Sequence, residues 1–77
     1  MKNKLVIYAK LLKDKLTENG CTFIMQKSEP VSKSIILQFH RNNVTGESVH
    51  KITDALKCIN MTEIGRDTIT ILIQEDL

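Results

Sequence analysis

Two hydrophobic periodicities follow one another along this chain, and their order restricts its fold. Residues 4–19 repeat apolar side chains at the spacing of one helix face, and the stretch ends at Asn19-Gly20, a helix stop signal. Lys10 and Lys13 fall on a different face of this segment. The first element is therefore predicted to be an amphipathic helix. Its apolar stripe consists of Leu5, Ala9, Leu12 and Leu16, flanked by Tyr8.

A second amphipathic helix is predicted over residues 46–59. Thr45 is a favourable N-cap, and Val44 and Val49 have the N′ and N4 spacing of a hydrophobic staple. The helix signal is therefore strongest at its N-terminus. The apolar stripe consists of Val49, Ile52, Leu56 and Ile59, with Ala55 at its edge.

The segments between and after these helices have the alternation of β-strands. Strands are predicted over residues 21–26, 34–40, 61–64 and 68–74, and the last of these is rich in β-branched residues. A polar connection interrupted by Pro30 joins the first two strands, as in an antiparallel hairpin. The two halves also echo each other, although generic β composition explains the echo equally well. The echo matches Thr22, Ile24, Ser34, Ile35 and Leu37 with Thr62, Ile64, Thr68, Ile69 and Ile71.

The predicted order is αββαββ, within one domain that spans residues 1–77. The fold class that fits this order is α+β, a two-layer sandwich in which an antiparallel sheet carries both helices on one face. A domain this small buries only ~60% of its unfolded surface, so a homodimer would add useful buried area. Alternation assigns the following side chains to the helix-covered face: Phe23, Met25, Ile35, Leu37, Phe39, Ile69, Ile71 and Ile73.

The opposite face of the sheet is the strongest candidate for a binding surface. Alternation places there Thr22, Ile24, Gln26, Ile36, Gln38, His40, Thr70, Leu72 and Gln74. The apolar centre has an uncharged polar rim, and an ordinary solvent-facing sheet would carry lysine and glutamate instead. Such a patch is typical of a protein interface, although a half-exposed sheet also tolerates a few β-branched residues. The predicted protein-binding residues are Ile24, Ile36, Gln38, His40, Thr70 and Leu72.

Two other functions use different residues. The net charge of +2 is too small to indicate nucleic-acid binding, but Lys10 and Lys13 on the first helix, with Arg41, are candidate phosphate contacts. His40 and Arg41 also combine the acid–base and charge-stabilising groups of a small ribonuclease-type toxin. The alternative for His40-Arg41-Asn42-Asn43 is a polar loop in which asparagine serves turn geometry. Both residues are expected at a strand end, so substitutions at His40 or Arg41 should cost little stability.

Metal, cofactor and membrane binding are not expected. The soft ligands Cys21, His40, His50 and Cys58 have long, irregular separations, unlike the paired ligands of zinc sites. No glycine-rich phosphate loop or nucleophile elbow is present in the sequence, so no cofactor and no catalytic residue are predicted. No segment has the apolar length of a membrane span or a signal peptide, and two well-separated cysteines fit a reducing compartment. The expected location is the cytoplasm.

These observations favour a non-enzymatic interaction protein that binds a protein partner or forms a homodimer through its sheet. A nucleic-acid-binding regulator is the second hypothesis, and a ribonuclease is the third. The composition, rich in lysine, isoleucine and asparagine, is that of an AT-rich genome, and the size is typical of a phage or mobile-element regulator or inhibitor.

Overall fold

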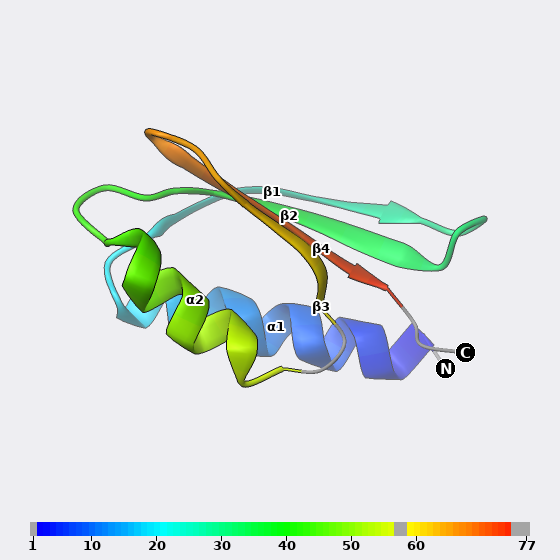
Figure 1. Cartoon of the computed structure of the whole chain (residues 1–77). Coiled ribbons are helices and arrows are strands. Elements are labelled where there is room, and N and C mark those ends of the chain that lie inside the picture. Colours follow the sequence, from blue (N-terminus) through cyan, green and yellow to red (C-terminus); the bar gives the residue numbers. More distant parts are fainter. Residues whose placement is uncertain (1, 57–58, 75–77) are drawn as a thin grey trace.

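The structure is a computed structural model that describes residues 2–56 and 59–74. Its elements follow the predicted order and confirm the α+β class, with two helices and a single antiparallel sheet. Figure 1 shows both helices on the same side of the sheet. The elements are α1 (Lys2–Glu18), β1 (Thr22–Glu29), β2 (Ser34–His40), α2 (Gly46–Asp54), β3 (Ile59–Ile64) and β4 (Thr68–Gln74).

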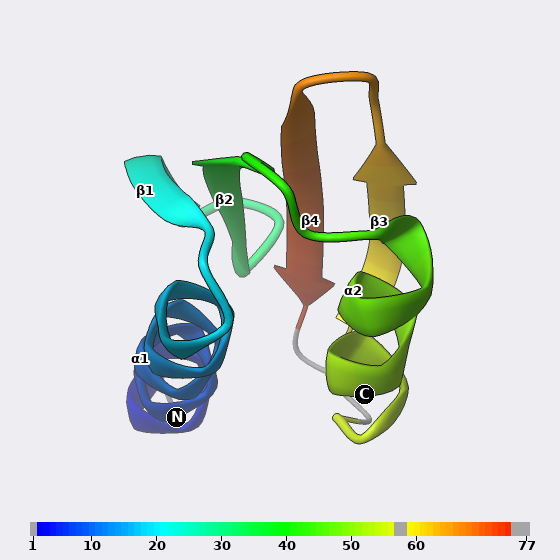
Figure 2. The same cartoon turned by 90° about the vertical axis from the view of Figure 1, so that its left-hand side faces the viewer.

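The sheet order is β1-β2-β4-β3, with every neighbouring pair antiparallel. The two hairpins therefore meet through β2 and β4 at the centre, where Leu37 pairs with Ile71. Figure 2 shows α1 beneath β1 and β2, and α2 beneath β4 and β3. Each half of the chain thus supplies one helix and the hairpin above it.

The ends of the helices follow from the capping residues. At the end of α1, the Gly20 amide donates to Thr17 O (3.1 Å) and the Cys21 amide to Leu16 O (2.9 Å). This is a Schellman motif, and it needs the positive φ of Gly20 (112°), which a residue with a Cβ adopts only with strain. At the start of α2, Thr45 Oγ1 accepts a hydrogen bond from the Ser48 amide (3.2 Å), which confirms the predicted N-cap.

The prediction that the second helix extends to residue 59 is wrong, because α2 ends at Asp54. Ile59 belongs to β3 and pairs with Ile73, so the chain has to leave the helix before it reaches the sheet. Residues 57–58 lie outside the described part. The helical periodicity of the sequence therefore extends beyond the actual end of the helix, because strand pairing determines the conformation of Ile59.

The core lies between the two helices and the central strands. The predicted helix-facing residues of β2 and β4 are all buried, as are the four residues of the α1 stripe. Phe23 is the exception among the predicted aromatic core residues, since it faces α1 but keeps 38% of its surface exposed. Its ring contacts Phe39 edge to face at a centroid distance of 5.6 Å. The largest fully buried side chains are Phe39, Leu12, Leu16, Leu37, Ile69, Ile71, Ile73 and Val49.

A bulge in β1 overturns part of the predicted alternation. Phe23 pairs with Phe39 and Met25 pairs with Gln38, so Ile24 occupies an extra position on β1. Beyond it, Met25 shares the face of Gln38, away from the helices, and Gln26 shares the buried face of Leu37. The prediction that Met25 is a core residue and Gln26 an outer one is therefore wrong, because one inserted residue reverses every later side chain.

The bulge has an electrostatic consequence for β1. Beyond Ile24, it places Lys27 opposite Ile36 on the face away from the helices. In an uninterrupted ladder, Lys27 would point toward α1, which presents Lys10 and Lys13 to this strand. The bulge thus keeps a third lysine off the helix-facing side of β1, where Lys10 and Lys13 line the hollow, and like charges at short range are destabilising.

The hairpin of β3 and β4 contains an equivalent irregularity. Ile59 pairs with Ile73 and Met61 pairs with Leu72, so β3 also has one extra residue between two consecutive pairs. Both hairpins therefore have one extra residue in their edge strand. Aligned on these irregularities, Met25 corresponds to Met61, whereas the echo expected from the sequence matched Thr22 with Thr62.

Candidate functional site

The candidate site is the sheet face that points away from α1 and α2, here called the outer face. Strand pairing arranges its side chains in rows that cross all four strands. One row contains Lys27, Ile36, Leu72 and Met61, and the next contains Met25, Gln38, Thr70 and Glu63. In the described part of the chain, no helix covers this face (Figures 1 and 2).

Of the three residues of the predicted apolar centre, the structure places Ile36 and Leu72 on the outer face. Ile36 and Leu72 pair with each other on the two central strands and are half-buried by their neighbours. Ile24 lies in the bulge at the edge of the sheet, with 40% of its surface exposed. Gln38 Nε2 donates a hydrogen bond to Thr70 Oγ1 (3.3 Å), so this polar pair satisfies part of its bonding within the face.

His40 lies at the end of β2, opposite Thr68, and is exposed. It therefore belongs to the rim of the outer face.

Two features of the outer face were missed by sequence reasoning. Met25 and Met61 extend the apolar surface toward both edges, and Met61 keeps 48% of its surface exposed. The premise that charges are absent from the face is wrong, because Lys27 projects from β1 and Glu63 from β3. On β1 the cause is the bulge, which simple alternation cannot show. On β3 a local signal exists, because alternation over residues 61–64 places Met61 and Glu63 on the face opposite Ile64.

The Arg41 side chain connects two loops through hydrogen bonds. Its side chain donates to two backbone carbonyls, from Nη1 to Gly65 O (2.6 Å) and from Nε to Val44 O (3.2 Å). The Arg41 amide also donates to Asp67 O (2.8 Å). These bonds support a structural role for the guanidinium, in preference to phosphate binding or catalysis.

Asn42 supports the polar-loop interpretation of residues 40–43. Its φ of 58° is in the left-handed region, which asparagine tolerates better than most residues. The side-chain Nδ2 donates to Gly20 O (2.7 Å) and Thr22 Oγ1 (2.9 Å). The loop is thereby fastened to the connection between α1 and β1.

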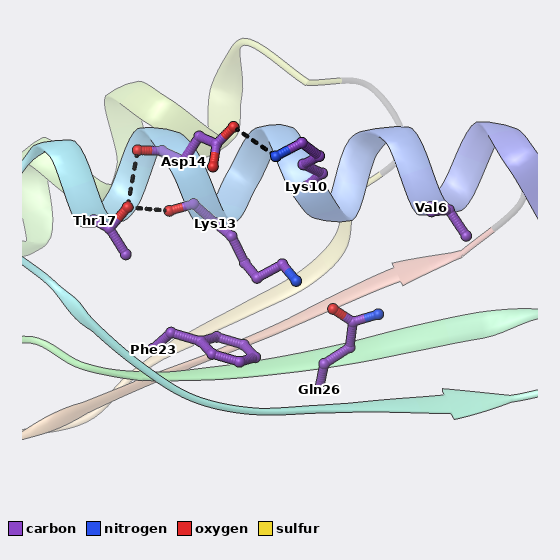
Figure 3. A pocket seen from close by; sticks show the side chains of 7 residues that line it. All are labelled: Val6, Lys10, Lys13, Asp14, Thr17, Phe23 and Gln26. Atoms are coloured by element: carbon purple, nitrogen blue, oxygen red, sulfur yellow. Dashed lines mark hydrogen bonds and ion pairs between the residues drawn. The ribbon is translucent and has the colours of Figure 1, made fainter.

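Lys10 and Lys13 lie on the side of α1 that faces β1 (Figure 3). Lys10 Nζ is 3.5 Å from the Asp14 carboxylate, and Lys13 Nζ lies 5.0 Å from the centre of the Phe23 ring. Both therefore border a hollow between the helix and the edge strand, away from Arg41. The structure does not bring the three predicted nucleic-acid contacts into one cluster.

The possible metal ligands are dispersed. Cys21 is a buried free thiol, and burial raises its pKa while the nearby Arg41 charge lowers it. A raised pKa keeps the thiol protonated and unreactive. His40 and His50 are exposed on different elements, and Cys58 lies outside the described residues. Across residues 2–56 and 59–74, no three His, Cys, Asp or Glu side chains converge as a metal site requires.

The comparisons with family models, curated proteins and solved structures gave no match to this chain. Neither helix in the described part has the length and apolar character needed to cross a membrane.

Proposed function

We propose that this chain is a non-enzymatic interaction protein that self-associates through its outer face. The observation that carries the proposal is the apolar surface formed by Met25, Ile36, Met61 and Leu72 on a sheet face that no described helix covers. Burial of apolar area is the main favourable term in protein association. A phage or mobile-element regulator or inhibitor in the cytoplasm is the biological setting we infer.

The charges at the edges favour one arrangement of two copies. If the two-fold axis runs parallel to the strands, β1 of one copy lies over β3 of the other, and Ile36 faces Leu72 of the second copy. Lys27 then lies near Glu63 of the second copy. The two residues are offset by one row, or ~7 Å along the strand direction, and the two sheets are packed ~10 Å apart. If the axis runs perpendicular to the strands, Lys27 instead approaches Lys27 of the second copy. Charge complementarity therefore selects the first arrangement.

The size of the face predicts a weak dimer. Four strands spaced ~4.8 Å apart, each of roughly seven residues at ~3.4 Å per residue, give a projected area of roughly 450 Å². A stable interface typically buries ~800 Å² on each partner. We therefore expect an association that depends on protein concentration in the micromolar range or above.

A charge-exchange experiment tests the face and the orientation together. Lys27→Glu and Glu63→Lys should each weaken self-association by roughly tenfold, because each replaces two attractive contacts per dimer with two repulsive ones. An equimolar mixture of the two variants should form a heterodimer, since both contacts are attractive again. Analytical ultracentrifugation measures these masses. Lys4→Glu, an exposed change on α1, is the control of equal charge.

Leu72→Lys should abolish the dimer by placing a charge at its apolar centre. A wild-type protein that stays at its 8.8 kDa monomer mass at millimolar concentration would overturn the proposal. If both single variants weaken self-association and their mixture does not form a heterodimer, the arrangement with the two-fold axis parallel to the strands is rejected.

A further inference from the structure

A groove runs between α1 and β1 along the edge of the sheet. β1 is a terminal strand of the sheet, and among the described residues it pairs with β2 alone. Two hollows of about 390 and 370 Å³ lie between this strand and α1, and both are lined by Val6. The groove therefore follows the seam from Thr17 and Phe23 to Pro30.

The bulge at Ile24 explains why this seam is open. It turns Gln26, which pairs with Leu37, toward the helix, and Ser28, which pairs with Ile35, has the same orientation. Neither polar side chain fills the space beside α1 as a large apolar one would. Val6 consequently keeps 54% of its surface exposed, and Figure 3 shows Gln26 directed toward the helix across the hollow.

The groove combines apolar and charged groups. Val6 and Phe23 supply the apolar surface, and Lys13 extends from α1 toward Phe23 (Figure 3). Lys10 also lines the groove and pairs with Asp14 on α1 (3.5 Å), and Glu29 lines its far end. The Lys13 ammonium lies over the Phe23 ring and has no ion-pair partner among the described residues. A carboxylate that enters the hollow would give it a charge-assisted hydrogen bond.

We propose that β1 and this groove bind an extended acidic segment of another protein by strand addition. The segment pairs with the free edge of β1 through main-chain hydrogen bonds, and alternate side chains enter the groove. One carboxylate contacts Lys13 and draws Lys10 away from its exposed pair with Asp14, and an apolar side chain covers Val6. The site is separate from the outer face, so the proposal does not depend on the proposed dimer.

The spacing of the groove defines the recognised pattern. Lys10 lies one helical turn after Val6, which is ~6 Å along α1. Side chains on one face of a strand repeat every two residues, or ~6.8 Å. An acidic and an apolar residue separated by one position therefore match Lys10 and Val6.

The test is selection from a displayed library of random octapeptides on the full-length protein. We expect the enriched peptides to carry an acidic and an apolar residue separated by one position. The Lys10→Gln, Lys13→Gln double variant should bind them at least tenfold more weakly. The matched control, Lys4→Gln with Lys15→Gln, removes equal charge from exposed positions of α1 outside the groove and should bind normally. N-methylation of alternate peptide amides should also abolish binding, because it removes main-chain donors.

Amide chemical-shift changes should be confined to β1 and α1. No enrichment, or equal loss of binding in both double-lysine variants, would overturn the proposal. Shifts centred on the outer-face residues Ile36 and Leu72 would also overturn it, because the peptide would then occupy the other surface. Binding of an oligothymidine probe that weakens on the loss of Lys10 and Lys13, with no peptide bound, would assign the groove to nucleic acid instead.

Discussion

Individual residues at the corner after β2 connect parts of the chain that are far apart in sequence. Arg41 joins this corner to the turn between β3 and β4 through its bond to Gly65 O, and Asn42 joins it to the end of α1 through Gly20 O. Both bonds reach backbone carbonyls at turns, where β ladders and helices leave acceptors unused. The pair thus fixes the relative positions of the two hairpins and the first helix.

The sequence predicts that a substitution at Arg41 has a negligible effect on stability. The hydrogen bonds of its side chain predict a larger one. Arg41→Ala should lower the free energy of unfolding by about 1–2 kcal/mol, since two bonds from a charged donor are lost at a partly exposed site. Urea denaturation measures the change. Arg66→Ala, at an exposed turn position, should stay within about 0.5 kcal/mol of the wild type. Equal effects of the two substitutions would show that the carbonyl contacts contribute nothing.

At the scale of elements, β1 is the strand whose role differs most from its sequence pattern. Seven of its eight residues are exposed, whereas every residue of β2 and β4 except His40 is buried or half-buried. The difference follows from its place at the edge of the sheet and from the bulge, which turns polar side chains toward α1. A bulge and charged residues are also common protection against unwanted pairing of an edge strand. Specific partners would then have to match the groove as well as the edge.

Met25 and Leu37 are both predicted core residues, but the bulge places Met25 on the outer face, and this difference can be tested. Met25→Ala should cost less than about 1 kcal/mol, because the side chain lies on the outer face. Leu37→Ala, at a fully buried position of β2, should cost about 2–5 kcal/mol. Chemical denaturation of both variants at low protein concentration, where a dimer is dissociated, gives the comparison. A cost for Met25→Ala close to that of Leu37→Ala would mean that β1 is not bulged in solution.

The whole molecule consists of two similar halves around the central pairing of Leu37 with Ile71. Each half has a helix, a bulged edge strand and a central strand, and both helices cover the same face (Figure 2). One layer of helices leaves the opposite face of the sheet uncovered by any described helix. The proposed self-association would cover this face and add to the small buried area of a domain of this size.

Coupling between association and folding gives a prediction for the intact protein. If the outer faces pair, the melting temperature of the wild type should rise with protein concentration, because association stabilises the folded state by mass action. Leu72→Lys should melt at a temperature independent of concentration. Scanning calorimetry from about 10 μM to 1 mM covers the expected range of a weak dimer. A wild-type melting temperature that stays constant over this range would contradict association through the sheet.

The sequence determined the class and order of the elements because these depend on local physical chemistry. The Thr45 cap and the Asn19-Gly20 stop located the start of α2 and the end of α1, and alternation located β2 and β4 within a residue. The structure starts α1 earlier than predicted, at Lys2, and extends β1 beyond its predicted end at residue 26 to Glu29. Only the tertiary structure decided where α2 ends and which faces β1 presents. Both depend on pairing with strands distant in sequence, and a single extra residue at Ile24 moves Met25 and Lys27 to the outer face. The position of Lys27 on that face, and the groove beside α1, were therefore beyond the reach of any local pattern.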